Sequence, residues 1–160
     1  MKKLIELFAK AYGWLNCGAS VLQSPILLIM RVYWGLSFFQ TGKGKLMDLS
    51  KPTEYFQSLG IPFPHQQAIL AGCTECVGGL LLAAGLASRL VSIPLTVVMI
   101  VAYLTAENEA LKAIFNNTDK FTSATPFLFL LTVLIVLAFG PGAFSLDWVV
   151  AKIYGKKKGE

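Results

Sequence analysis

The sequence predicts an all-α fold: a transmembrane four-helix bundle with an amphipathic interfacial helix at each end. Of its 160 residues, 55% are hydrophobic and 14% are charged. The mean hydropathy of +0.62 is too high for an ordinary soluble domain. The apolar residues gather in four runs, each near the roughly 20 residues that a helix needs to cross a bilayer. One domain, residues 1–160, accounts for this length.

Residues 2–18 are predicted to be an interfacial helix. The apolar residues of this segment recur at helical spacing: Leu4, Ile5, Phe8, Tyr12 and Leu15. Glu6 and Lys10 interrupt the apolar stretch that a signal peptide requires. We therefore expect the segment to be retained and to lie at the headgroup boundary.

The first predicted span, residues 24–41, begins at Ser24-Pro25, where proline suits a helix start. The span contains a charged residue, Arg31. The same helical stripe carries Gly35, Phe38, Gly42 and Lys45. A cationic, glycine-bearing face is therefore predicted to look into the bundle.

The second predicted span, residues 65–88, contains an acid, Glu75. An ionised carboxylate inside a bilayer costs several kcal/mol unless it is paired, hydrogen-bonded or protonated. Its helical face carries mostly small residues, which allow another helix to approach: Ala68, Ala71, Gly72, Gly78, Gly79 and Leu82. We predict that Glu75 faces protein and that Arg31 is its partner, either as a functional polar centre or as a structural ion pair.

The loops and the remaining spans follow from the same patterns. Residues 43–64 are predicted to be a loop that keeps apolar residues and folds back on the bundle mouth. The third span covers residues 90–106, with Tyr103 and Glu107 as candidate lining residues, and residues 107–121 form a charged loop. The fourth span, residues 122–140, ends at a Gly-Pro-Gly, and residues 143–154 form the second interfacial helix before a lysine cluster.

The basic residues predict the orientation. Four spans place eight Lys and Arg residues on the side of the two termini and five on the other. This excess predicts cytoplasmic termini. The basic residues lie at the ends of apolar runs rather than in an aromatic-interleaved surface, so we expect no nucleic-acid partner.

Two cysteines flank the buried acid in a C-x-x-C, Cys73 and Cys76. They are either a redox dithiol or two small core residues, and an apolar setting, which disfavours the thiolate, favours the second interpretation. Cys17 lies in a separate segment and His65 is the lone histidine, so we predict no metal site.

Four ordered motifs resemble the DoxX family. They are R-x-x-x-G-x-x-F-x-x-x-G-x-x-K from Arg31, G-I-P-x-P from Gly60, E-x-x-G-G-L-L-L-x-x-G-L-x-x-R from Glu75, and G-P-G-x-x-S-L-D from Gly140. The resemblance implies a four-helix integral membrane protein. Some members are subunits of thiosulfate:quinone oxidoreductase and others are linked to membrane redox complexes that handle thiol stress. The C-x-x-C is not part of the family pattern.

The resemblance therefore implies an integral membrane subunit of a quinone-linked redox system that handles sulfur or thiol compounds. The alternative is a non-catalytic membrane anchor or scaffold for partner proteins, and solute transport is a weaker third class. Candidate ligand-binding residues are Arg31, Lys45, Glu75, Tyr103 and Glu107. A quinone is the candidate cofactor, and no residue pattern names the substrate or a catalytic residue.

The expected partners are the lipid bilayer and other protein subunits, with a homo-oligomer left open. The expected location is a bacterial or archaeal cytoplasmic membrane, as a multi-pass protein with both termini in the cytoplasm.

Overall fold

The computed structural model describes residues 2–156, apart from the side chains of residues 2–9, 11, 16, 17, 155 and 156. The described chain is helical and contains no strand. Its helices are α1 (Lys2–Met47), α2 (Ser50–Ser58), α3 (Pro64–Ala84), α4 (Ser88–Thr105), α5 (Asn108–Lys112), α6 (Thr118–Thr122), α7 (Pro126–Phe139) and α8 (Leu146–Lys156).

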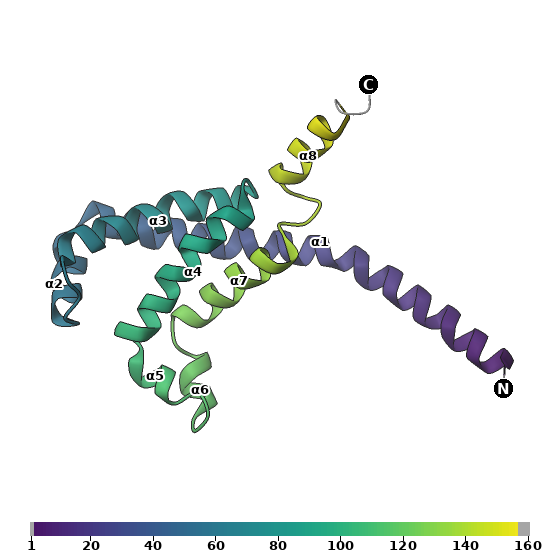
Figure 1. Ribbon diagram of the computed structural model, residues 1–160, viewed down its shortest axis with the longest axis horizontal. Helices are drawn as coiled ribbons and strands as arrows, with labels where there is room; N and C mark the ends of the chain where they lie inside the picture. The colour runs from purple at the N-terminus through teal and green to yellow at the C-terminus, as the bar shows by residue number, and fades with distance from the viewer. Residues whose placement is uncertain (1, 157–160) are drawn as a thin grey trace.

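The bundle is built from two antiparallel helix pairs, α1 with α3 and α4 with α7 (Figure 1). Three helices are long and apolar enough to cross a membrane: Tyr12–Met47 within α1, α3 and α4. The helix in the fourth predicted span, α7, is more apolar than these three but has only 14 residues. At about 1.5 Å per residue it is roughly 21 Å long, shorter than a typical hydrocarbon core.

Helix α1 differs from the sequence prediction, which separated an interfacial helix (residues 2–18) from a span (residues 24–41). The structure has one continuous helix of 46 residues, with Pro25 inside it. A proline inside a helix removes one backbone hydrogen bond and crowds the carbonyl four residues earlier, which favours a kink but need not end the helix. The first buried residue among the described side chains is Leu27, and the part before it projects away from the bundle (Figure 1).

The α1–α3 contact depends on glycine. A Cβ added to Gly79 would lie 2.5 Å from the backbone oxygen of Gly35, and one added to Gly35 would lie 2.7 Å from the nitrogen of Ala83. Gly42 meets the backbone of α3 at Gly72 and Cys76 in the same way. The two backbones therefore touch, as in membrane helix pairs built on small residues, and these contacts fix the register of α1 on α3.

The hydrophobic core joins both helix pairs. Its aromatic centre is the edge-to-face pair of Phe38 and Phe129, with ring centroids 4.5 Å apart, and Trp34 adds a second edge contact to Phe129 at 4.8 Å. The aliphatic residues of this cluster come from α3, α4 and α7: Leu82, Val91, Leu95, Val133 and Val136. Burial of this cluster holds α4 and α7 against the α1–α3 pair.

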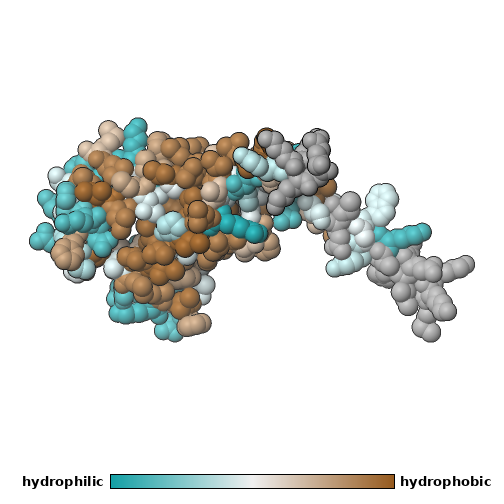
Figure 2. Space-filling view, turned by 45° about the horizontal axis from the view of Figure 1, so that its top comes forward, coloured by the Kyte–Doolittle hydropathy of each residue, from teal (hydrophilic) through white to brown (hydrophobic). Residues whose placement is uncertain are grey.

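The two predicted loops contain short helices. The segment predicted as a loop over residues 43–64 holds the end of α1 and all of α2, which packs on α3. The charged segment 107–121 holds α5 and the start of α6. Figure 2 shows hydrophobic side chains over the middle of the bundle and hydrophilic ones at the α2 end and the α5–α6 end. This distribution fits helices surrounded by lipid.

Candidate functional site

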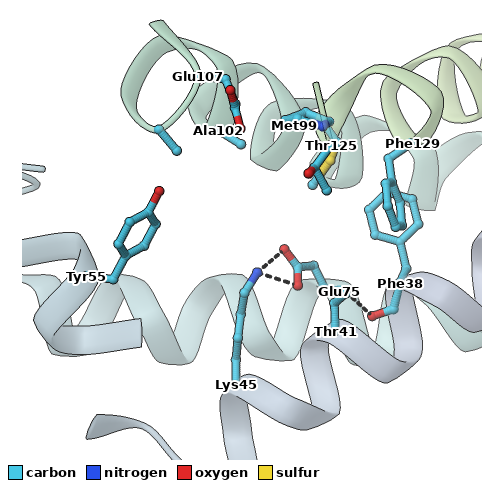
Figure 3. Close-up of a pocket in the computed structure, with 12 residues that line it drawn as sticks. Phe38, Thr41, Lys45, Tyr55, Glu75, Met99, Ala102, Glu107, Thr125 and Phe129 are labelled. Carbon is cyan, nitrogen blue, oxygen red and sulfur yellow. Dashed lines mark hydrogen bonds and ion pairs between the residues drawn. The ribbon is translucent and has the colours of Figure 1, made fainter. Parts of the chain in front are cut away.

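The polar centre of the bundle is an ion pair between α1 and α3. The Nζ atom of Lys45 donates to both carboxylate oxygens of Glu75, at 2.5 and 2.6 Å (Figure 3). Glu75 is 2% exposed, whereas the Lys45 side chain is 29% exposed. The prediction that Glu75 faces protein is confirmed, because it is buried together with Ala68, Gly72, Gly78, Gly79 and Leu82.

The partner that we predicted for Glu75 was wrong. Arg31 and Lys45 share one stripe of α1 but lie 14 residues apart, which is about 21 Å along the helix axis. The glycine contacts place Gly42 beside Gly72 and Cys76, and therefore Lys45 beside Glu75. The helical period identifies the face on which a residue lies, but the backbone contacts decide which cation reaches the acid.

Arg31 instead joins three segments at the other end of the bundle. Its guanidinium donates to the carbonyl oxygen of Ala83 at 3.3 Å and to that of Phe144. Asp147 is the acid that acts electrostatically on it. Gly85, at φ +71°, leaves room for the guanidinium, since a Cβ there would collide with it. Arg31 thus ties α1 to the end of α3 and to the α7–α8 connection.

Asp147 completes the turn between α3 and α4. Its two carboxylate oxygens accept hydrogen bonds from the backbone nitrogens of Ala87 at 2.6 Å and Ser88 at 2.9 Å. These nitrogens are among the free donors at the start of α4, and a carboxylate also suits the positive end of a helix dipole. The motifs that begin at Glu75 and Gly140 therefore meet at this turn. We call the hydrogen bonds of Arg31 and of Asp147 described above, taken together, the Arg31–Asp147 clamp.

Two cavities share the Lys45–Glu75 pair as a wall. The smaller, of about 240 Å³, lies toward α7, and its polar lining includes Thr41, Glu107 and Thr125 (Figure 3). The larger, of about 560 Å³, lies between α2, α3 and α4 and is mostly apolar. Five residues line both cavities: Lys45, Tyr55, Glu75, Ala102 and Ala106. The cavities are therefore adjacent compartments around one ion pair.

Of the other predicted lining residues, Glu107 lines the smaller cavity and Tyr103 lines neither. The Tyr103 side chain is 3% exposed, stacks on Phe121 at 5.1 Å between centroids, and donates its hydroxyl to the Phe121 carbonyl at 3.0 Å. Its place is structural, because it joins α4 to α6.

The two cysteines of the C-x-x-C are both free. Cys73 is exposed on α3 and Cys76 is half-buried, and neither lines either of these two cavities. Cys17 lies outside the described side chains. Within the described residues, no cluster of His, Cys, Asp and Glu could hold a metal ion.

Tyr55 is the site residue that sequence reasoning missed. It lies on α2, lines both cavities and points toward the side of Ala102 and Glu107 (Figure 3). The sequence did offer one indication of its role: the segment predicted to fold back over the bundle mouth keeps aromatic residues. A helical pattern in that short segment would have assigned a face to Tyr55.

The long apolar helices with a buried ion pair between them define the class: an α-helical membrane protein with a polar site inside its bundle. The chain belongs to the DoxX family, whose sequence model, described as DoxX, matches residues 26–108. The resemblance seen in the motifs is therefore confirmed, and the matched segment includes Arg31, Lys45 and Glu75.

Two bacterial relatives match most of the chain. The protein named "Putative oxidoreductase CatD" of Bacillus subtilis is 33% identical over 132 residues, which is 82% of this chain and 90% of the relative. The "Uncharacterized membrane protein Rv3486" of Mycobacterium tuberculosis is 32% identical over 136 residues, covering 80% of this chain and 83% of the relative. No solved structure matches the chain.

Proposed function

We propose that this protein is the membrane subunit of a quinone-linked redox system acting on sulfur or thiol compounds, and that a quinone-like ligand binds beside Lys45 and Glu75. The observation that carries the proposal is the larger cavity, whose apolar wall is interrupted by the ion pair. Its volume of about 560 Å³ suits a small organic ligand. Family membership and the name of the Bacillus relative support the redox assignment.

The residues of the cavity suit such a ligand. Lys45 is an ammonium with three N–H donors, and its bonds to the two Glu75 oxygens leave one for a ligand carbonyl oxygen. Tyr55 adds a hydroxyl, and α4 supplies aliphatic contacts through Val97, Val98 and Val101. These residues would orient the ring of a bound quinone and exclude water from it. The quinone would take two electrons and two protons as the thiol or sulfur compound is oxidised, and would leave as the quinol.

A ligand titration tests the proposal. A short-chain naphthoquinone is added to the purified full-length protein in detergent, and quenching of intrinsic tryptophan fluorescence gives the Kd. Ala102→Leu narrows both cavities and should raise the Kd at least about tenfold. Ala84→Leu places the same side chain at an exposed position of α3 and should leave the Kd unchanged. Absence of saturable binding, or equal Kd values for the two variants, would refute the proposal.

The alternative function, a non-catalytic anchor or scaffold, is favoured by one observation. Both oxygens of Glu75 are already satisfied by Lys45, as in an ion pair that only fixes helix register. The paired replacement Lys45→Met with Glu75→Gln separates the two functions. Stable protein that no longer binds quinone favours the ligand site, whereas stable protein with unchanged quinone binding shows that the pair is structural.

The proposed orientation has both termini in the cytoplasm, supported by the eight-to-five distribution of basic residues. Reporter fusions at Ser50 and Asn116 should report the outer side, and a fusion after Lys157 the cytoplasm. The opposite pattern would reverse the orientation without affecting the ligand site.

A further inference from the structure

Helix α1 is too long for the bundle that it belongs to. Its 46 residues correspond to about 69 Å, whereas a whole bilayer with its headgroups is about 40–45 Å thick. Its partner α3 has 21 residues, or roughly 32 Å. The excess lies at the N-terminus, where α1 projects from the bundle (Figure 1). We call residues 2–23 the arm.

The arm exposes large apolar side chains. Tyr12 is 68% exposed, Trp14 84%, Leu15 70% and Leu22 59%. Tyr12, Leu15 and Leu22 share a helical stripe. Lys10 is exposed on the opposite side, which also exposes Trp14 and Val21. The arm therefore has an apolar face that nothing in the described chain covers.

The junction between the arm and the bundle is held by the segment that connects α7 to α8. The hydroxyl of Ser24 accepts a hydrogen bond from the backbone nitrogen of Ala143 at 3.2 Å, and Gly142 packs against Ser24 and Leu27. The next residue is Pro25, which cannot donate a hydrogen bond to the carbonyl of Val21. The helical ladder is therefore weakened next to the contact with Gly142 and Ala143, and such a position is a common site of helix bending.

We propose that the arm bends at Ser24–Pro25 and binds the anionic surface of the membrane, with its apolar stripe toward the acyl chains. Lys2, Lys3 and Lys10 exceed the single acid Glu6, which suits anionic headgroups. Tyr and Trp favour the headgroup region. The exposed helix α8, whose Trp148 carries Lys152 over its ring, lies at the same end of the bundle (Figure 1).

Depth-dependent quenching tests this proposal on the full-length protein. Cys17→Ser, Cys73→Ala and Cys76→Ala remove the native thiols, and Leu15→Cys or Lys10→Cys carries a fluorescent label on one or the other face of the arm. The labelled proteins are reconstituted in phosphatidylcholine–phosphatidylglycerol vesicles whose acyl chains carry bromine near the headgroup or near the bilayer centre. Thermal unfolding compared with that of wild type verifies that each labelled protein is folded.

The label at Leu15→Cys should be quenched more by shallow than by deep bromines, and roughly twofold more than the label at Lys10→Cys. Leaving out phosphatidylglycerol should reduce this quenching. An unquenched Leu15→Cys label places the arm in water or against protein, and strongest quenching by deep bromines makes the arm part of a span. Either result overturns the proposal.

The bend itself is tested by Pro25→Ala, which restores the missing backbone donor and stiffens the helix. This change should abolish the difference between the two labels. Pro94→Ala, a change of the same kind inside α4, should preserve it. If the difference survives Pro25→Ala, the bend at Pro25 is refuted.

Discussion

Replacing Lys45 should destabilise the protein more than replacing Glu75, because the two partners are buried to different extents. In Lys45→Met the carboxylate of Glu75, 2% exposed, loses the one ion-pair partner that it has among the described side chains. Breaking a buried pair in this way costs about 3–5 kcal/mol. In Glu75→Gln the Lys45 side chain, 29% exposed, can stay hydrated through the cavities, so we expect a loss of about 1 kcal/mol.

Thermal unfolding in detergent provides the measurement. The double variant Lys45→Met with Glu75→Gln should be more stable than Lys45→Met alone, because it leaves no unpaired carboxylate in the bundle. In a double-mutant cycle with Arg31→Met in place of Lys45→Met, the losses in the free energy of unfolding should be additive within about 0.5 kcal/mol. Equal losses for Lys45→Met and Glu75→Gln, or coupling of Glu75 to Arg31 instead of Lys45, would refute the assigned pairing.

Further substitutions test the contacts around this pair. Gly79→Ala should cost about 1–3 kcal/mol in thermal unfolding because its Cβ collides with the α1 backbone, whereas Gly13→Ala, with open space around it, should not destabilise. Cys73→Ala with Cys76→Ala should change stability by about 1 kcal/mol or less and leave quinone binding intact; quinone-dependent oxidation of the two thiols, measured by mass spectrometry, would contradict this. Arg31→Met should cost about 2–4 kcal/mol because two backbone carbonyls lose a charged donor, and an unfolding temperature equal to that of wild type would disprove the Arg31–Asp147 clamp.

The sequence predicted the faces of the helices but not their axial register. The small residues around Glu75 correctly indicated that this acid is buried, because helical spacing alone assigns residues to a face. Two cations, Arg31 and Lys45, shared one face of α1, and nothing in the spacing of α1 distinguished them as partners of Glu75. The choice depends on backbone contacts at Gly42, which form only when both helices are present.

Other features could not be predicted because they join residues far apart in the chain. Arg31 donates to a backbone carbonyl at Phe144, and a carbonyl acceptor has no sequence signature. The continuity of α1 through Pro25 was missed because proline is a probable, not obligatory, helix boundary. Tyr55 was missed as a site residue because its segment was assigned to a loop, where no helical face can be defined.

The Arg31–Asp147 clamp also constrains the order of events during synthesis. The turn before α4 depends on a carboxylate 59 and 60 residues later in the chain. Until that late segment leaves the ribosome, the first amides of α4 have no protein acceptor and Arg31 lacks one of its two carbonyl partners. The early helices can enter the membrane one by one, but the bundle cannot lock until Phe144 and Asp147 have been made. The segment after α7 thus acts as a latch for helices that were made well before it.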